Sequence, residues 1–166
     1  MTLYHLSELP DIARFDPRPS AYTDQPAVWA ISAERIANYL VPRDCPRVCF
    51  RAGPQTTATD ITRHLEDHRP VVAIEARWLE RLRTGRLYRY AMPREGFVMQ
   101  DEDAGYWVAH QPVTPLGVDK VEDLAAAIAR AGATLRVLLS LWALHDEIRA
   151  SSLVYSMIRM RNAQPR

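Results

Sequence analysis

The chain has 166 residues, of which 48% are hydrophobic and 25% are charged, and its net charge is +1. This length and composition fit one soluble globular domain that spans residues 1–166. The near-zero net charge excludes a global field that would attract nucleic acid or membrane, so any such binding must come from a local patch.

The chain carries no pattern typical of export or membrane insertion. Its N-terminus lacks a charged segment followed by an apolar stretch, so we expect no signal peptide. The longest strongly apolar stretch, residues 135–144, is far shorter than the roughly 20 residues of a membrane span. Cys45 and Cys49 would lie too far apart on an extended strand to form a disulfide. We therefore expect a cytoplasmic protein with reduced thiols.

The first half of the chain predicts three strands separated by a long loop and two helices. A strand over 2–6 leads through a short helical turn over 10–15 into a loop over 15–26, where three prolines deny the backbone regular pairing. A strand over 27–31 precedes a helix with Ser32 as its N-cap. A strand over 47–51 and a helix over 59–68 follow.

The second half predicts five more strands and three helices. A strand over 71–74 and a helix over 76–84, ended by Gly85, come first. Three antiparallel strands follow over 87–92, 96–100 and 105–109. A helix from Asp119 or Lys120 to Gly132, a strand over 135–139 and a helix from Ser140 to about Met160 complete the chain. This mixture without strict alternation predicts an α+β fold, with a mixed, mainly antiparallel sheet flanked by helices.

His5 and Ser7 are the first candidate binding residues. On a strand their side chains share a face, opposite Tyr4 and Leu6. A histidine and a hydroxyl at the end of a strand can together donate to and accept from a ribose. The alternative is a histidine that hydrogen-bonds the backbone within the fold.

Trp29 and Tyr39 form the second candidate pair. If Ser32 caps a helix, Tyr39 lies about two turns into it and can fold back beside the strand that carries Trp29. Two aromatic planes placed in this way can sandwich a flat ring, since such stacking contributes ~1–3 kcal/mol per base. Packing of the same two rings in the core between helix and sheet is the alternative.

These residues carry a resemblance to a known family. The segment 3–7 (LYHLS) resembles the first-strand motif of ADP-ribosyltransferases of the His-Tyr-Glu class, and the segment 29–39 resembles their second motif. The resemblance implies an ADP-ribosyltransferase-like fold with NAD as cofactor. It gives His5 and Ser7 the ribose and amide of NAD, and Trp29 and Tyr39 the nicotinamide ring. The chain as a whole also resembles a bacterial family of unknown function, which implies no activity.

The chain departs from the His-Tyr-Glu pattern in three ways. The second motif is one residue short, Trp29 replaces the usual Tyr, and no Glu stands where the family has its catalytic acid. That acid stabilises the cation formed as the nicotinamide bond breaks. Glu102, just before the predicted strand at 105–109, is the best candidate for it. The resemblance therefore implies nucleotide binding, with transfer or release of ADP-ribose as the activity that depends on Glu102.

Arg43 lies between Pro42 and Pro46, in what we expect to be a rigid turn. Because it closely follows Tyr39, it is a candidate to face the same cleft as His5. A role in stabilising the turn is the alternative.

A group of arginines lies between Arg77 and Arg94, interleaved with Trp78, Tyr88 and Tyr90. Basic residues alternating with aromatics suit RNA, here through Arg83, Arg86 and Arg89, although a solvated surface is the favoured explanation. The second functional hypothesis is therefore a non-catalytic binding module for RNA or a protein partner. The apolar face of the predicted C-terminal helix also leaves a homodimer open.

Overall fold

The computed structural model describes residues 2–166, which form ten strands and several short helices. The strands are β1 (Leu3–Ser7), β2 (Val28–Ser32), β3 (Arg47–Arg51), β4 (Val71–Glu75), β5 (Arg86–Met92), β6 (Val98–Asp101), β7 (Tyr106–Ala109), β8 (Gly117–Glu122), β9 (Thr134–Leu138) and β10 (Val154–Ile158). The α-helices are α1 (Ala58–His64), α2 (Leu79–Thr84), α3 (Leu124–Arg130) and α4 (Trp142–Arg149), and the 3₁₀ helices are η1 (Ala33–Tyr39), η2 (Ala76–Trp78) and η3 (Met160–Asn162).

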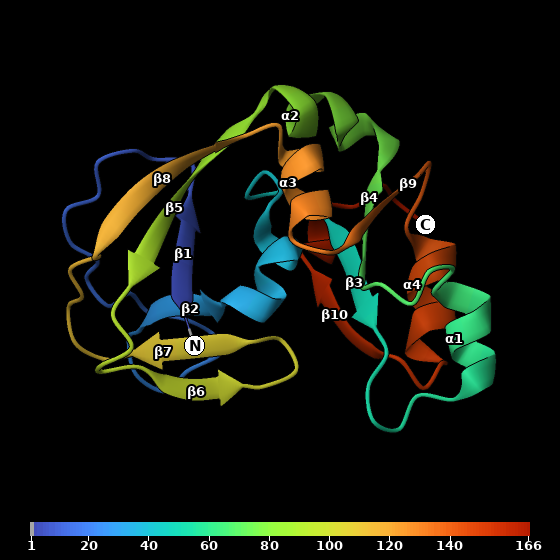
Figure 1. Ribbon diagram of the computed structural model, residues 1–166, viewed down its shortest axis with the longest axis horizontal. Coiled ribbons are helices and arrows are strands. Elements are labelled where there is room, and N and C mark those ends of the chain that lie inside the picture. The colour runs from blue at the N-terminus through green and yellow to red at the C-terminus, as the bar shows by residue number, and fades with distance from the viewer. Residues whose placement is uncertain (1) are drawn as a thin grey trace.

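The strands form two sheets that lie side by side (Figure 1). The larger has the order β6-β7-β2-β1-β5-β8, and the smaller has the order β10-β3-β4-β9. All pairings are antiparallel except that of β4 with β9, which is parallel. The α+β class with a mixed, mainly antiparallel arrangement is therefore confirmed, but the strands divide between two sheets instead of forming one.

Three hydrophobic clusters hold these layers together. The first lies between the sheets, where η1 and α3 pack against β2, β3 and β4, and it includes Ile31, Ile36, Val72 and Ile128. The second covers the outer face of the larger sheet and is closed by the loop that carries Phe15. The third packs α1 and α4 on the outer face of the smaller sheet. The smaller sheet thus has helices on both faces, as Figure 1 shows.

Four predicted elements differ in the structure. No helical turn forms over 10–15, where Phe15 instead bridges to Val113. The expected helix start at Asp119 or Lys120 is strand β8, and α3 begins only after Asp123. The long C-terminal helix is the shorter α4 followed by β10. The helix after Ser32 is the 3₁₀ helix η1, and the Ser32 side chain makes no capping hydrogen bond to it.

Within residues 2–166, no helix combines the length and the apolar character needed to cross a lipid bilayer.

Candidate functional site

The larger sheet opens between β1 and β2. Strand β1 pairs with β5 along all of its residues, from Leu3 to Ser7, but with β2 only at Leu3 and Tyr4. Figure 1 shows the reason, since β1 runs upright while β2 and β7 run across the lower part of the molecule. We call the gap between residues 5–7 and 28–30 the β1–β2 opening. It interrupts a sheet that is otherwise continuous.

The backbone of Leu6 faces this opening. The Thr2 carbonyl accepts a hydrogen bond from the Ala33 amide at 3.0 Å, and Tyr4 is paired with Ile31. Alternate residues of a strand direct their backbone groups to the same neighbour, so Leu6 is the next residue whose N–H and C=O point toward β2. The β1–β2 ladder of the described chain ends before Leu6. In a regular ladder the Leu6 N–H and C=O would pair with Trp29, whose carbonyl oxygen instead lies 2.8 Å from His5 Nδ1.

His5 spans the opening with its side chain. Its Nδ1 lies 2.8 Å from the Trp29 carbonyl oxygen, and its ring lies 4.6 Å from that of Phe15. Burial lowers the pKa of His5, and the positive charges of Arg43 and Arg18 lower it further. His5 is therefore neutral at pH 7. Because a carbonyl can only accept, Nδ1 carries the proton and Nε2 is left as an acceptor.

Trp29 and Tyr39 belong to a row of aromatic rings on the inner face of the larger sheet. Tyr106 on β7 stands between them, with ring centroids 5.3 Å from Trp29 and 5.6 Å from Tyr39, both edge to face. The buried guanidinium of Arg47 lies 5.4 Å from the Tyr39 ring. Burial and the Tyr106 hydroxyl raise the pKa of Tyr39 far above its usual value. The row is uncharged at neutral pH and borders the opening at Trp29.

The four side chains named from the sequence do not line one cleft. His5 packs with Phe15 on the outer face of the sheet, as expected from its alternation with Tyr4. Trp29 and Tyr39 lie on the inner face with Tyr106. The Ser7 hydroxyl accepts from the Leu9 amide at 3.0 Å and so belongs to a turn. The hydrogen bond from His5 Nδ1 to the Trp29 carbonyl links the two groups of side chains.

Arg43 and Glu8 lie together at one end of the opening. The Arg43 amide donates to Glu8 Oε1 at 3.0 Å, and the positive charge of Arg43 lowers the pKa of His5. Glu8 directly follows β1, so it brings a carboxylate to the site that the sequence patterns did not single out. This carboxylate could have been anticipated only from its position, directly after the candidate strand.

Glu102 lies elsewhere, in the turn between β6 and β7. Its backbone carbonyl accepts a hydrogen bond from the Gly105 amide, and its side chain is exposed. Its negative charge acts to raise the pKa of Arg35 on η1. Within residues 2–166 no hydrogen bond or ion pair joins its carboxylate to His5, Trp29 or Tyr39. The structure therefore places this candidate acid in a different neighbourhood from the opening.

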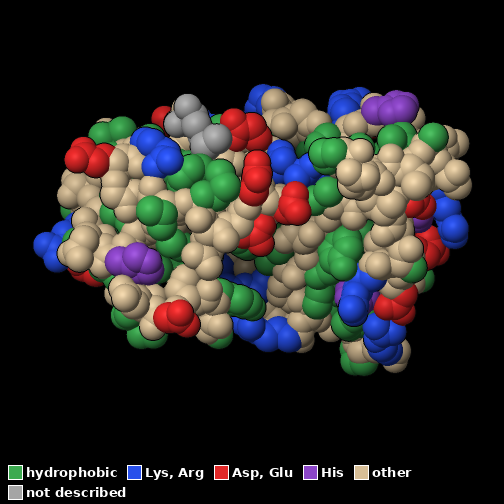
Figure 2. All heavy atoms as spheres, turned by 90° about the horizontal axis from the view of Figure 1, so that it is seen from below, with side chains coloured by type: hydrophobic (Ala, Val, Ile, Leu, Met, Phe, Trp, Pro, Cys, Tyr) green, Lys and Arg blue, Asp and Glu red, His purple; other side chains and the backbone are tan. Residues whose placement is uncertain are grey.

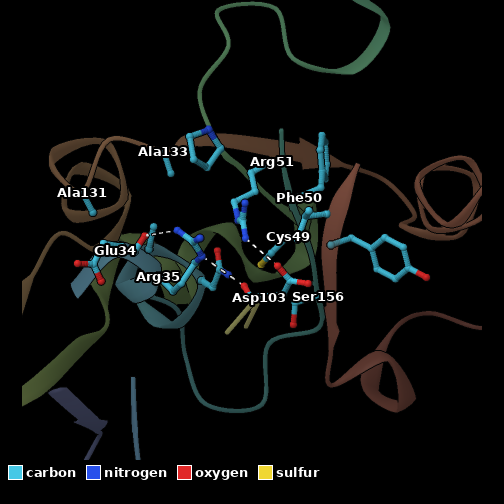
Figure 3. Close-up of a pocket in the computed structure, with 14 residues that line it drawn as sticks. Glu34, Arg35, Cys49, Phe50, Arg51, Asp103, Ala131, Ala133 and Ser156 are labelled. Carbon is cyan, nitrogen blue, oxygen red and sulfur yellow. Dashed lines mark hydrogen bonds and ion pairs between the residues drawn. The ribbon is translucent and has the colours of Figure 1, made fainter. Parts of the chain in front are cut away.

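The same turn meets the smaller sheet across a hollow between the two sheets. Figure 2 shows this side of the molecule hollowed, with basic side chains inside and acidic ones along its edge. Arg51 Nη2 of β3 donates to Asp103 Oδ1 at 3.1 Å, and Arg35 Nε of η1 donates to the Asp103 carbonyl at 3.3 Å (Figure 3). The cavity beside them measures about 30 Å³, room for one or two waters. We interpret this cluster as a clasp between the sheets.

The arginine group does not form one surface. Arg77 pairs with the buried carboxylate of Glu75, and Arg89 pairs with Asp119. Arg94 lies over the Trp107 ring at 3.9 Å. The exposed members at the end of α2 and the start of β5 are Arg81, Arg83 and Arg86. An RNA surface built from Arg83, Arg86 and Arg89 would therefore include one side chain that is already paired.

The described chain offers little for metal or thiol chemistry. In residues 2–166, no three His, Cys, Asp or Glu side chains are grouped so as to hold a metal ion. Cys45 and Cys49 are free and buried. Burial raises the pKa of each thiol to about 12, so both stay protonated at neutral pH. Neither is a nucleophile in this state.

The fold and site define a two-sheet α+β domain whose larger sheet is opened between two strands and bordered by histidine, aromatic and arginine side chains. The chain belongs to the family of unknown function DUF6886, whose profile matches residues 4–163. The resemblance of the whole chain to a family of unknown function is thus confirmed. No curated protein and no solved structure matches the chain.

Proposed function

We propose that this domain binds NAD or a related nucleotide at the β1–β2 opening, in the manner of an ADP-ribosyltransferase-like domain. The observation that carries the proposal is the end of the β1–β2 ladder before Leu6, which leaves the Leu6 backbone without its ladder partner on β2. A strand edge with one free N–H and one free C=O is complementary to a primary carboxamide, which has an acceptor and a donor in one plane. Nicotinamide carries this group, and adenine has a similar pair along one edge.

The side chains around Leu6 supply the other contacts that such a ligand needs. Trp29 and Tyr106 offer aromatic surface for a flat ring on the inner face. The neutral His5, on the outer face, keeps Nε2 as an acceptor for a ribose hydroxyl of a ligand that passes through the opening. Arg43 brings a positive charge to the same end of the opening. Ser7, whose hydroxyl is used in a turn, is not needed for the proposal.

Transfer or release of ADP-ribose would need a carboxylate close to the forming cation. Glu8 is the carboxylate at the opening, through its hydrogen bond with the Arg43 amide. We therefore extend the proposal to catalysis only through Glu8, and Glu102 becomes its matched control. Loss of NAD cleavage in Glu8→Gln with retention in Glu102→Gln would support this role. The reverse result would assign the catalytic role to Glu102.

The binding proposal is tested by the thermal stability of the pure protein with and without NAD. Ligand at ten times its Kd stabilises the folded state by about 1.4 kcal/mol, which raises Tm by about 3–5 °C in a domain of this size. We expect this shift in the wild type and in a Tyr22→Leu control, whose aromatic side chain is exposed and does not belong to the row of Trp29, Tyr106 and Tyr39. We expect no shift in Trp29→Leu. An unchanged Tm for the wild type in millimolar NAD would refute the proposal.

A further inference from the structure

A second hollow lies beside the β1–β2 opening, where α2 ends and β5 begins. It is lined by Glu8, Pro42, Arg81, Thr84, Gly85, Arg86 and Leu124, and we call it the Arg81 hollow. Its volume is about 330 Å³, which falls at the lower end of the range of small-molecule sites, about 300–1,000 Å³. In size alone it suits a ligand group better than the narrow cavity at Asp103 does.

Two unpaired cations dominate the lining. Arg81 and Arg86 are exposed, and within residues 2–166 neither guanidinium has a carboxylate within 4.0 Å. Arg81 is held over the Trp78 ring at 4.7 Å, which orients its guanidinium without neutralising it. Arg86 stands opposite Glu122 on β8, but that carboxylate pairs with Lys120. The hollow is therefore positively charged.

Glu8 is the single carboxylate among the lining residues, and it connects the hollow to the opening. Its Oε1 accepts from the Arg43 amide, so part of its charge is already compensated. Pro42 lines the hollow, and the charge of its neighbour Arg43 is close enough to lower the pKa of His5 in the opening. A single elongated ligand could therefore reach from Leu6 into the hollow past Glu8.

We infer that the Arg81 hollow binds the phosphate or diphosphate group of the nucleotide whose amide-bearing or base end lies in the β1–β2 opening. Guanidinium groups bind phosphate oxygens with paired, charge-assisted hydrogen bonds, and two unpaired arginines at one hollow match a group with more than one negative charge. The inference rests on the proposed function for the identity of the ligand. It gives part of the arginine group a specific role.

Calorimetric titration at constant ionic strength separates the two sites. The ligands are inorganic pyrophosphate for the hollow, nicotinamide for the opening and NAD for both. The variant is the double substitution Arg81→Gln/Arg86→Gln. The matched control is Arg130→Gln/Arg149→Gln, which removes the same charge from exposed arginines of α3 and α4.

We expect Arg81→Gln/Arg86→Gln to weaken pyrophosphate and NAD binding by about tenfold or more. Each substitution removes charge-assisted hydrogen bonds to phosphate oxygens, and each such loss weakens binding. Nicotinamide binding should be unchanged in both variants, and the control should bind all three ligands like the wild type. Glu8→Gln should tighten pyrophosphate binding a few-fold by removing a nearby negative charge. Inorganic phosphate and AMP titrated in parallel distinguish a free anion from a phosphate on a nucleotide.

Equal weakening of pyrophosphate binding in the two double variants would show general charge attraction and overturn the inference. A wild type that binds a short single-stranded RNA through Arg81 and Arg86 but does not bind pyrophosphate would also overturn it, in favour of a polynucleotide surface. If pyrophosphate binding depends on Arg81 and Arg86 while nicotinamide and NAD do not bind, the proposed function fails and the phosphate site stands.

Discussion

At the scale of single residues, His5 links the stability of the domain to pH. Its pKa in the folded state is lowered from 6.5, chiefly by burial, so the unfolded chain binds the proton more readily. The neutral side chain therefore contributes stability that is fully present above pH 6.5 and is lost as the pH falls through the lowered pKa. The sign follows from the greater number of protons bound by the unfolded state in that range.

We predict that His5→Asn, which keeps an amide donor for the Trp29 carbonyl, flattens this pH dependence. Denaturant unfolding at several pH values between about 5 and 7.5 measures it. The control is His110→Asn, because His110 is exposed and also bonds a backbone carbonyl. A slope that stays the same in His5→Asn and the wild type would contradict the account of His5.

The hydroxyl of Tyr39 is buried without a hydrogen-bond partner of good geometry. A buried unsatisfied hydroxyl costs about 1–3 kcal/mol. We therefore predict that Tyr39→Phe leaves the free energy of unfolding unchanged or raises it by up to about 1 kcal/mol. Thermal and denaturant unfolding measure the change. A loss of more than about 1 kcal/mol would show that the hydroxyl is satisfied in solution.

The candidate residues of β1 could be predicted from the sequence, but their neighbours in the folded chain could not. The alternation that places His5 opposite Tyr4 was correct, because it follows from strand geometry alone. Tyr106 was not identified as a site residue, because its place between Trp29 and Tyr39 depends on the register of β7 against β2. The opening itself depends on where a ladder of hydrogen bonds stops. Such long-range pairings leave no mark in the local sequence.

At the scale of elements, Gly85 fixes the turn between α2 and β5. A Cβ atom at this position would lie 2.4 Å from the Arg81 carbonyl oxygen, a backbone atom that cannot move freely. We predict that Gly85→Ala destabilises the domain by about 1–3 kcal/mol. Denaturant unfolding measures this loss. Gly117→Ala, where nothing lies within 4 Å of the added atom, is the control and should change stability by less than about 1 kcal/mol.

The elements that the sequence predicted wrongly at β8 and β10 have a common cause. In each case a strand lies next to a helix in the chain, and the apolar residues of the two elements together have helical spacing. Val121 in β8 falls at helical spacing from Leu124 and Ile128, so the sequence predicted one helix across both. The signal for the break was Asp123, which has a left-handed backbone and accepts from the Ala126 amide as the N-cap of α3. The C-terminal region divides in the same way between α4 and β10.

At the scale of the whole molecule, the C-terminal residues are fastened to the smaller sheet. The buried Glu75 carboxylate accepts from the Gln164 amide at 2.9 Å and from Arg77 Nε at 2.8 Å. Arg166 bonds both oxygens of Asp146, and this contact lowers the pKa of Asp146 to about 2. The Trp142 indole also donates to the Gln164 carbonyl at 2.6 Å, so both buried and exposed contacts hold these residues.

We predict that Glu75→Gln destabilises the domain by about 1–3 kcal/mol, because one of its two buried acceptor oxygens becomes an NH₂ group and leaves either Arg77 or the Gln164 amide without an acceptor. The C-terminal residues should also become sensitive to limited proteolysis. Glu147→Gln is the control, since Glu147 forms an exposed pair with Arg63 at 4.0 Å and such pairs contribute about 0–1 kcal/mol. Equal stability losses in the two variants would contradict the anchoring role of Glu75.

The class of the fold was predictable from the chain because mixed strands and helices without strict alternation exclude a doubly wound sheet. Its division into two sheets was not predictable. The return of the chain as β10 beside β3 pairs residues near the C-terminus with residues near position 50, and local patterns do not encode such a pairing. The clasp at Asp103 depends on how the two sheets meet, and the β1–β2 opening depends on where the ladder within the larger sheet stops.

The central claim, that the β1–β2 opening binds an amide-bearing nucleotide through the backbone of Leu6, is tested most directly by nuclear magnetic resonance of the ¹⁵N-labelled protein. Nicotinamide and NAD are titrated against nicotinic acid, which has no amide donor. We predict that the two amides shift the backbone amide of Leu6 and the indole of Trp29 together, with saturation, while nicotinic acid shifts neither at the same concentration. An unmoved Leu6 amide in saturating NAD would contradict the claim.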